Sequence, residues 1–402
     1  MSNKKGFKRK LIKDVVEAPI KLVSEVFEET TDLFKESGEL QKGQGLLSGV
    51  IALTLAILCF LGVIAFHFPE YLTMPELRQK YSVDLLRQIM FYSMLMSSGI
   101  AVYNIVLKRN RNLNIAAFSL IMLTTFLGGS QVPVGDFPGN TPYIGLDWFI
   151  LDLLGSTMVF ILIEKLFPLY KKQAIFRKEW QTDFIHFMVN HFIVGLILLT
   201  VNFLIHRVFG WMIRSDFQQF IQNISFIPQL LICILVADFM QYWTHRSYHE
   251  VPFLWKFHSV HHSAKTMDWL AGSRQHVLEL IFTRVCILGP LYVFGFEKSV
   301  MDAYILVVGF QAVFNHSNVH LPWGPLKYFV VTPDFHHWHH SSDEIAIDKN
   351  YAAHYSFLDY IFKTNIKVDP KQKFPQSYGV VGDYMPDGFL KQQAFPFKRE
   401  KK

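Results

Sequence analysis

The sequence has little charge and few cysteines. Charged residues make up 18% of its 402 positions, whereas an average soluble domain carries about 25%. The three cysteines, Cys59, Cys233 and Cys286, lie far apart in apolar stretches, so we expect neither a disulfide framework nor a zinc site built on cysteine. With 51% hydrophobic residues the chain is not disordered, and its net charge of +6 does not indicate a conventional nucleic-acid-binding protein.

The hydrophobic residues are gathered in runs of membrane-spanning length. A helix that crosses a bilayer needs about 20 predominantly apolar residues. Six apolar runs precede residue 240, namely 43–69, 88–107, 113–133, 148–163, 184–206 and 217–237. Five of them are uncharged and of spanning length, and the fourth, 148–163, is shorter and contains only the charged residue Asp152. Two later apolar runs, 278–296 and 303–321, are interpreted as a hairpin that enters the membrane and returns to the same side. The sequence therefore predicts an all-α, polytopic membrane protein.

The charges of the connecting loops predict its orientation. Lys108, Arg109 and Arg111 follow the second run, and five further basic residues follow the fourth. The loop 134–147 between them has neither Lys nor Arg. Because basic residues accumulate on the cytoplasmic side of a membrane, we expect the N-terminus, the C-terminus and the region after the sixth run to be cytoplasmic.

On this basis the chain divides into four parts. Residues 1–43 begin with a basic cluster and continue with apolar residues at helical spacing, which predicts a cytosolic amphipathic segment on the membrane surface. Residues 44–212 contain the N-terminal membrane helices. Residues 213–366 form a histidine-rich domain whose site caps the membrane helices, and residues 367–402 form a cytosolic tail.

Histidine is the unusual residue of this chain. Twelve of its 17 histidines lie between positions 245 and 340. Ten of them form four groups with spacings of three or four, which place side chains on one face of a helix. Imidazole suits Zn, Cu, Fe and Ni, and ten imidazoles exceed the needs of one tetrahedral ion. The candidate ligands of two metal ions are His245, His249, His258, His261, His262, His316, His320, His336, His339 and His340.

Nearby carboxylates are candidates for holding these rings in place, because a metal-bound imidazole usually donates its other N–H to a carboxylate or a carbonyl. Asp238, Asp268, Glu279, Asp334 and Asp348 are close to the histidine groups in sequence, and Asp238, Glu279 and Asp348 are taken as the three leading candidates. The isolated histidines are interpreted instead as ordinary side chains near a membrane interface. These are His67, His186, His191, His206 and His354.

The order H-x3-H, H-x2-HH and a late H-x2-HH resembles that of the sterol desaturase and fatty acid hydroxylase superfamily of membrane di-iron enzymes. The segments FRKEWQTDF (176–184) and DGFLKQQAFPF (387–397) resemble bacterial members of this superfamily. The segments DFMQYWTHRSYHEVPFLWKFHSVHH, NHSNV, TPDFHHWHHSSDEIAIDKNY and LDYIFKT extend the similarity over residues 238–364. Ala352 and Lys363 stand where the family often has glycine, and His276 and His337 are additional histidines.

The resemblance implies that the ten histidines bind two iron ions and that O2 is the co-substrate. It implies hydroxylation, or monooxygenation, of a membrane lipid such as a sterol, a fatty acyl chain or an ether lipid. The last is included because some boxes also resemble those of alkylglycerol monooxygenases. The chain has no haem, flavin or ferredoxin motif, so we expect a separate reductase and a carrier similar to cytochrome b5 or ferredoxin.

Two alternatives remain open. A lipid desaturase would use the same di-iron site, and the histidine spacing does not separate desaturation from hydroxylation. A metal transporter or sensor would carry polar residues near the middle of several spans, but the first three runs have few. The expected location is a bacterial inner membrane, with the active site on the cytoplasmic face.

Overall fold

The computed structural model describes residues 46–78, 80, 82–109, 111–135, 143–368, 374–382 and 385–398. In this part of the chain the regular elements are helices, with two isolated β-bridges, Pro168 to Val319 and Ser341 to Tyr378. The predicted all-α class is confirmed. The predicted amphipathic segment 1–43 lies outside the described residues. The chain forms two compact units, the first up to Ile150 with residues 174–176, and the second comprising residues 151–173 and 177–402.

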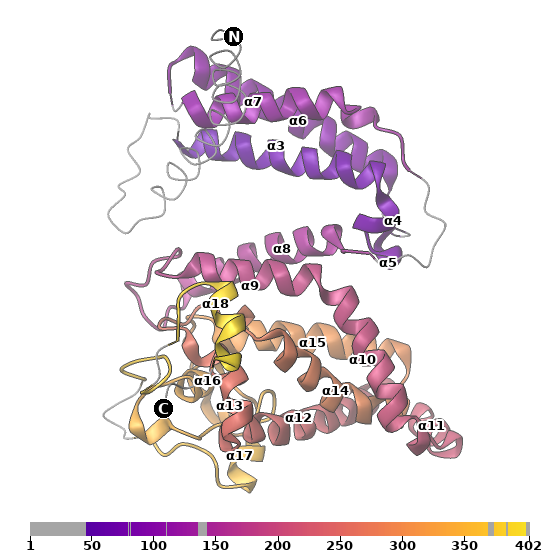
Figure 1. Cartoon of the computed structure of the whole chain (residues 1–402), viewed down its shortest axis with the longest axis vertical. Helices are drawn as coiled ribbons and strands as arrows, with labels where there is room; N and C mark the ends of the chain where they lie inside the picture. Colours follow the sequence, from indigo (N-terminus) through magenta and orange to yellow (C-terminus); the bar gives the residue numbers. More distant parts are fainter. Residues whose placement is uncertain are drawn as a thin grey trace, which may run out of the picture. The chain divides into compact units, whose positions relative to one another are not determined.

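Three long helices pack against one another in the first unit (Figure 1). They are α3 (Leu46–His67), α6 (Val83–Val106) and α7 (Arg111–Phe126), with the short α4 (Pro69–Leu72), α5 (Pro75–Arg78) and η2 (Gly129–Gln131). Their shared core contains Ala52, Ala56, Ala101 and Ala117, each 0% exposed. Small residues at helix contacts let the backbones approach closely, as is usual in membrane bundles.

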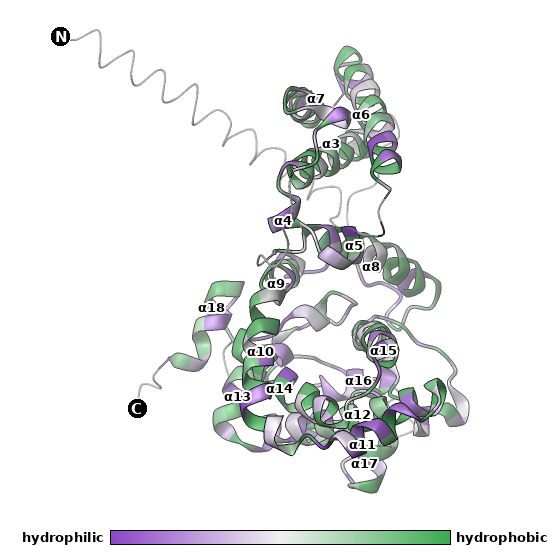
Figure 2. Ribbon diagram, turned by 90° about the vertical axis from the view of Figure 1, so that its right-hand side faces the viewer, coloured by the Kyte–Doolittle hydropathy of each residue, from purple (hydrophilic) through white to green (hydrophobic). Residues whose placement is uncertain are grey.

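Buried polar side chains in this unit are hydrogen-bonded between helices. Ser97 Oγ donates to the carbonyl oxygen of Ala52 at 2.7 Å, and Asn104 Nδ2 donates to Asn114 Oδ1 at 3.1 Å. Large apolar side chains such as Leu95 and Phe126 are exposed, and much of α3 and α6 is hydrophobic (Figure 2). Apolar outer faces and internally satisfied polar groups are what a hydrocarbon environment requires.

The second unit contains the remaining helices. They are α8 (Leu146–Leu166, from Leu151 onward), α9 (Trp180–Phe192), α10 (Val194–Phe209), η3 (Gly210–Met212), α11 (Ser215–Gln222), α12 (Phe226–Glu250), α13 (Pro252–His258), η4 (His261–Ser263), η5 (Ala271–Ser273), α14 (Val277–Phe294), α15 (Lys298–His316), η6 (Gly324–Tyr328), α16 (Pro333–His339), η7 (Glu344–Ala346), α17 (Phe357–Ile361), α18 (Phe389–Ala394) and η8 (Phe395–Phe397).

The core of the second unit lies where α12 packs on α14 and α15. Its buried side chains include Cys233 and Ala237 of α12, Leu291 of α14 and Tyr304 of α15. Helix α10 packs against the other side of α14 through a second apolar cluster around Val201. This frame fixes the ends of α12 and α15, from which the histidines extend.

The described residues include six helices that are long and apolar enough to cross a membrane, namely Ser48–His67, Val83–Val106, Arg111–Gln131, Leu146–Leu166, Phe226–Glu250 and Val277–Phe294. The predicted run 184–206 is not one straight helix. It forms α9 and the segment Leu196–Met212, which are bent by 58°. If this bent pair is one span, the chain has six candidate spans up to Glu250, the number predicted before the histidine cluster, but the sixth already contains His245 and His249. Of the predicted hairpin, α14 has the composition of a span and α15 does not.

The sixth predicted run, 217–237, also differs in the structure. The helix is interrupted after α11, which ends at Gln222, and a new helix, α12, begins at Phe226 and continues to Glu250. His245 and His249 therefore lie on the last turns of a spanning helix and do not follow it. Polar side chains are tolerated here because they are buried against protein: Asp238 is 0% exposed and His245 is 5% exposed.

Candidate metal centre

The structure gathers nine histidines into two groups whose candidate ligand atoms all lie within 4.8 Å of one another inside each group. The first group has five members, His245, His249, His258, His262 and His339. The second group has four members, His261, His316, His336 and His340. The two groups are neighbours, because the ring centroids of His262 and His340 are 4.4 Å apart.

Local backbone geometry distributes the histidine boxes between the groups. His261 and His262 lie in the 3-10 turn η4, where successive side chains point about 120° apart, so each contributes to a different group. In α16, His336 and the C-cap residue His340 share the second group, whereas His339 turns to the first. Each H-x2-HH box thus serves both groups.

The ring nitrogens converge. In the first group, His258 Nε2 lies 3.1 Å from both His245 Nε2 and His262 Nε2. In the second group, His316 Nε2 lies 3.2 Å from His261 Nε2 and 3.1 Å from His336 Nε2. A neutral imidazole offers one lone pair and one N–H. Several ring nitrogens that converge within each group can therefore direct their lone pairs at one shared cation.

The other ring nitrogen of several histidines donates to an oxygen that can only accept. Nδ1–H of His245 donates to the carbonyl oxygen of Tyr351 at 2.7 Å, and that of His339 donates to Lys349 at 2.8 Å. In the second group, Nδ1–H of His261 donates to the carbonyl oxygen of Arg274 at 3.0 Å, and Nδ1–H of His316 donates to the carbonyl oxygen of Ala312 at 2.7 Å. These bonds fix the tautomer and leave the Nε2 lone pair free to coordinate.

Two Nε2 atoms of the first group are buried without a hydrogen-bond partner. His249 Nε2 and His339 Nε2 have no hydrogen-bond partner among the described residues, and such burial is unfavourable unless something binds them. Burial and the neighbouring imidazoles also lower the pKa of His339 well below its ordinary value. A neutral imidazole is the form that binds a metal. The donor set and its orphaned atoms therefore fit two metal ions.

The three candidate carboxylates lie in different positions. Glu279 Oε1 accepts from His258 Nδ1 at 2.7 Å, the arrangement proposed for it. Asp348 Oδ1 is 3.4 Å from His249 Nδ1. Among the described residues, the Asp238 carboxylate has no imidazole partner: it accepts the backbone N–H groups of residues 353, 354 and 355 at 3.1, 3.0 and 2.6 Å. It holds the loop that provides the Tyr351 carbonyl.

His320 is not brought to either group, contrary to expectation. Its Nδ1 lies 2.8 Å from Asp334 Oδ2, and its side chain is 47% exposed. The expectation assumed helical spacing from His316, but α15 ends at His316 and Ser317 is extended. Without the helix, a spacing of four no longer places two side chains on one face.

Some histidines assigned to the membrane interface are buried in polar networks instead. His186 is 0% exposed and contacts Gln275 and Gln392, and His354 is 8% exposed and contacts Gln311. His191 pairs with Asp152 at 2.7 Å. The signal that would have found the network around His186 is the charged segment 176–184, FRKEWQTDF, which precedes an apolar run.

Comparisons with known proteins agree with this geometry. The fatty acid hydroxylase family model matches residues 230–364. The ornithine lipid hydroxylase OlsE of Rhizobium tropici is 31% identical over 43% of this chain and 51% of its own length. Human alkylglycerol monooxygenase is 35% identical over 32% of this chain and 29% of its own. Methylsterol monooxygenase 2-2 of Arabidopsis thaliana is 28% identical over 44% of this chain and 66% of its own length.

The match thus spans about half the length of the ornithine lipid hydroxylase. No solved structure matches the chain significantly. The matched residues 230–364 include all nine histidines of the two groups. Over this region, about a third of the chain, the protein is similar to the fatty acid hydroxylase family.

Proposed function

We propose that this protein is an O2-dependent hydroxylase of a membrane lipid, with two iron ions held by the five-histidine and four-histidine groups. The observation that carries the proposal is the convergence of nine buried or nearly buried imidazoles in two neighbouring groups. Imidazole alone would also accept zinc, copper or nickel. Iron is preferred because the similar proteins are named hydroxylases and monooxygenases.

The proposed reaction converts a C–H bond, O2, two electrons and two protons into a C–OH group and water. When bound, an iron pair would supply the oxidising power for this step. The residues of the chain bind the ions and hold the rings. Carbonyl oxygens fix the tautomers of His245, His261, His316 and His339, and the burial of the site excludes bulk water from it.

A lipid substrate is supported by the position of the site on membrane helices. His245 and His249 lie at the end of α12, a candidate span of 25 residues, so a substrate in the bilayer lies beside the helix that carries two candidate ligands. The names of the similar proteins include an ornithine lipid, an alkylglycerol and a methylsterol as substrates. They favour hydroxylation over desaturation, and they support a lipid without choosing among these classes.

We further propose that a separate electron carrier and its reductase deliver the electrons at the cytoplasmic face. The sequence contains no redox-cofactor motif of its own. Basic residues in the loop between α8 and α9, such as Lys171 and Lys172, are exposed. An exposed basic surface favours docking of an acidic carrier, and this docking weakens with salt.

The proposal is tested by comparing lipid extracts of cells with and without the gene by mass spectrometry. We expect a lipid that gains one oxygen atom only in cells that carry the wild-type gene and not in cells that carry His339→Ala. The appearance of a lipid that has lost two hydrogen atoms would favour the desaturase. Identical lipid profiles, in cells that produce the protein and a competent redox partner, would contradict both activities.

A further inference from the structure

A short loop, 268–275, lies against two of the four histidines of the second group. The carbonyl oxygen of Arg274 accepts the Nδ1–H of His261 at 3.0 Å. Gly272 is so close to His316 that an added Cβ would lie 2.8 Å from the ring Nδ1 and 2.9 Å from Cγ. This loop therefore sets the tautomer of one candidate ligand and limits the position of the other ring.

Both ends of the loop are held by four buried charges. Ion pairs join Asp268, Arg177, Asp183 and Arg274 in a row, and the loop from Asp268 to Arg274 closes this row into a ring. Arg177 donates from Nε and Nη2 to the two oxygens of Asp268, at 2.8 Å each. Arg274 Nε donates to Asp183 Oδ1 at 2.5 Å, and Arg177 Nη2 donates to Asp183 Oδ2 at 2.6 Å. The four side chains are at most 5% exposed. Because the charges alternate in sign, removing one leaves an uncompensated buried charge.

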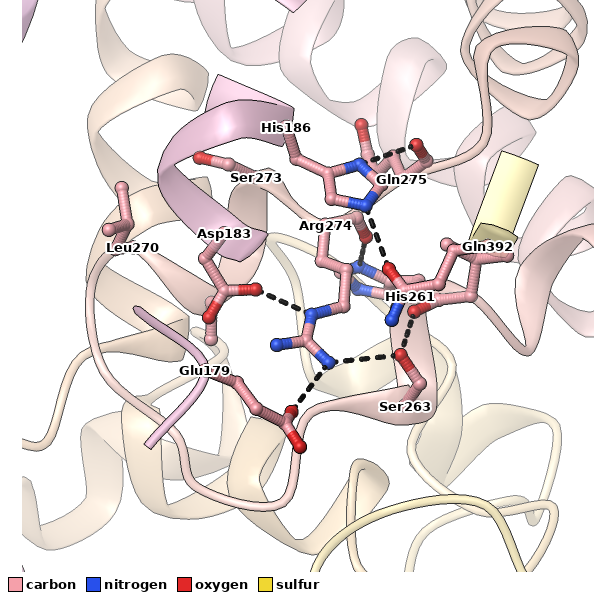
Figure 3. A network of polar contacts seen from close by, with 12 residues as sticks. Glu179, Asp183, His186, His261, Ser263, Leu270, Ser273, Arg274, Gln275 and Gln392 are labelled. Atoms are coloured by element: carbon pink, nitrogen blue, oxygen red, sulfur yellow. Dashed lines mark hydrogen bonds and ion pairs between the residues drawn. The ribbon is translucent and has the colours of Figure 1, made fainter. Parts of the chain in front are cut away.

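Helix α9 presents one face to the same loop. Asp183, His186 and Asn190 are spaced by three and four residues, which places them on one side of the helix. His186 Nδ1 lies 3.2 Å from the Gln275 carbonyl oxygen, and Asn190 Nδ2 donates to the Ser273 carbonyl oxygen at 2.9 Å. Figure 3 shows Asp183 and His186 facing Arg274 and Gln275, with His261 beside them.

The guanidinium of Arg274 has further partners. Its Nη1 donates to Glu179 Oε2 and to Ser263 Oγ, each at 3.2 Å (Figure 3). Ser263 directly follows His261 and His262 in the turn η4. The side chain of Arg274 thus connects α9 to the turn that carries one candidate ligand of each group, while its backbone carbonyl orients His261.

We infer that the ring of Arg177, Asp183, Asp268 and Arg274, together with Gly272, is the positioning device of the four-histidine group. Two members of the ring, Arg177 and Asp183, lie outside the family-matched residues 230–364. Metal binding at the second group therefore depends on α9 and the segment before it. The inference rests on the proposed metal-binding function, and these residues act through His261 and His316 without belonging to either histidine group.

Gly272→Ala tests the inference most sharply, with Gly309→Ala as the matched control. A Cβ at Gly272 would collide with the His316 ring, whereas a Cβ at Gly309, on the helix that carries His316, meets nothing within 4 Å. Metal-free protein in detergent is titrated anaerobically with ferrous 57Fe, and bound iron and the Mössbauer spectrum are measured. We expect two sites in wild type and in Gly309→Ala. We expect at least about tenfold weaker binding at one site only in Gly272→Ala.

The role of the four charges in iron binding is tested by substitutions that remove or keep one charge at a time. Asp183→Asn removes the bridging charge and should weaken the same site as Gly272→Ala, changing the same Mössbauer component. Arg274→Lys keeps a cation beside Asp183, so it should retain more iron at that site than Arg274→Met. If Asp183→Asn does not fold, Gly272→Ala still decides the question.

The outcomes separate this inference from the proposed function. Wild-type affinity at both sites in Gly272→Ala and in folded Asp183→Asn would overturn the inference. Equal weakening of both sites in folded variants would also overturn it, because that is the effect of a general structural role. Absence of iron from the wild-type protein itself would instead overturn the proposed function.

Discussion

Glu279 and His258 form a buried pair: Glu279 Oε1 lies 2.7 Å from His258 Nδ1, and their side chains are 5% and 3% exposed. Loss of such a partner typically lowers metal affinity or activity by about 10- to 100-fold. Glu279→Ala should therefore weaken iron binding in the five-histidine group by that factor. Glu279→Gln keeps an oxygen that accepts from Nδ1–H and should be affected less. Equal iron affinity in Glu279→Ala and wild type, by anaerobic titration, would show that this bond does not hold the ring.

Asp238 is predicted to matter for stability more than for metal binding. Its carboxylate accepts three backbone N–H groups of the loop 353–355. Each donor left unsatisfied in a buried site costs about 1–3 kcal/mol, so Asp238→Ala should destabilise the protein by roughly 3 kcal/mol or more. Thermal unfolding in detergent measures the loss.

The matched control for this change is Asp302→Asn. Asp302 pairs with Lys298 on the surface, and both side chains are more than half exposed. Exposed pairs contribute about 0–1 kcal/mol, so the control should melt near the wild-type temperature. A melting temperature of Asp238→Ala that equals that of the control would refute the role assigned to the carboxylate.

His354 predicts a dependence of stability on pH. Burial lowers the pKa of His354 from its ordinary value of 6.5 to about 4. The unfolded chain therefore takes up this proton first, and stability is lost as the pH falls from about 6.5 towards 4. At pH 5 this one group contributes a loss of about 2 kcal/mol. His354→Gln removes the titration, so its stability should fall less steeply than that of wild type between pH 7 and pH 5. Parallel curves would contradict the argument.

The fold was predictable from the sequence where one physical signal dominated. Uncharged runs of spanning length predict the helices α3, α6 and α7, and an apolar run with the single charge Asp152 predicts α8, because hydrocarbon imposes both composition and length. The break between α9 and α10 was not predictable in this way, since the run 184–206 contains no Asp, Glu, Lys or Arg from end to end. The predicted run ended at residue 237 because the segment that follows, with His245 and His249, is polar. Helix α12 nevertheless continues to Glu250, since tertiary contacts bury these polar side chains.

The candidate site was predictable only in part for the same reason. Helical spacing correctly joins His336 to His340, but it cannot show that α15 ends at His316 and leaves His320 outside. The split of the neighbouring residues His261 and His262 between two groups depends on a 3-10 turn. The acceptors for four of the nine rings, those of His245, His261, His316 and His339, are backbone carbonyls, which no side-chain pattern reveals.

The orientation in the membrane is tested by labelling single introduced cysteines from each side. Helix α8 (Leu146–Leu166) is a candidate span, so positions 140 and 172 should be labelled from opposite sides. The basic loops predict that position 172 is cytoplasmic. Labelling of both positions from the same side would refute the proposed orientation and the count of spans on which it rests.

The metal content of purified protein tests the central claim most directly. Protein from iron-supplemented cells is analysed for total metal per chain, beside His316→Ala, His339→Ala and His320→Ala. We expect about two metal ions per chain in wild type and in His320→Ala, because His320 lies outside both groups, and clearly fewer in the other two variants, each of which loses a ligand that no neighbour replaces. A wild-type protein with no bound metal, or His316→Ala and His339→Ala proteins that keep the full wild-type content, would contradict the account.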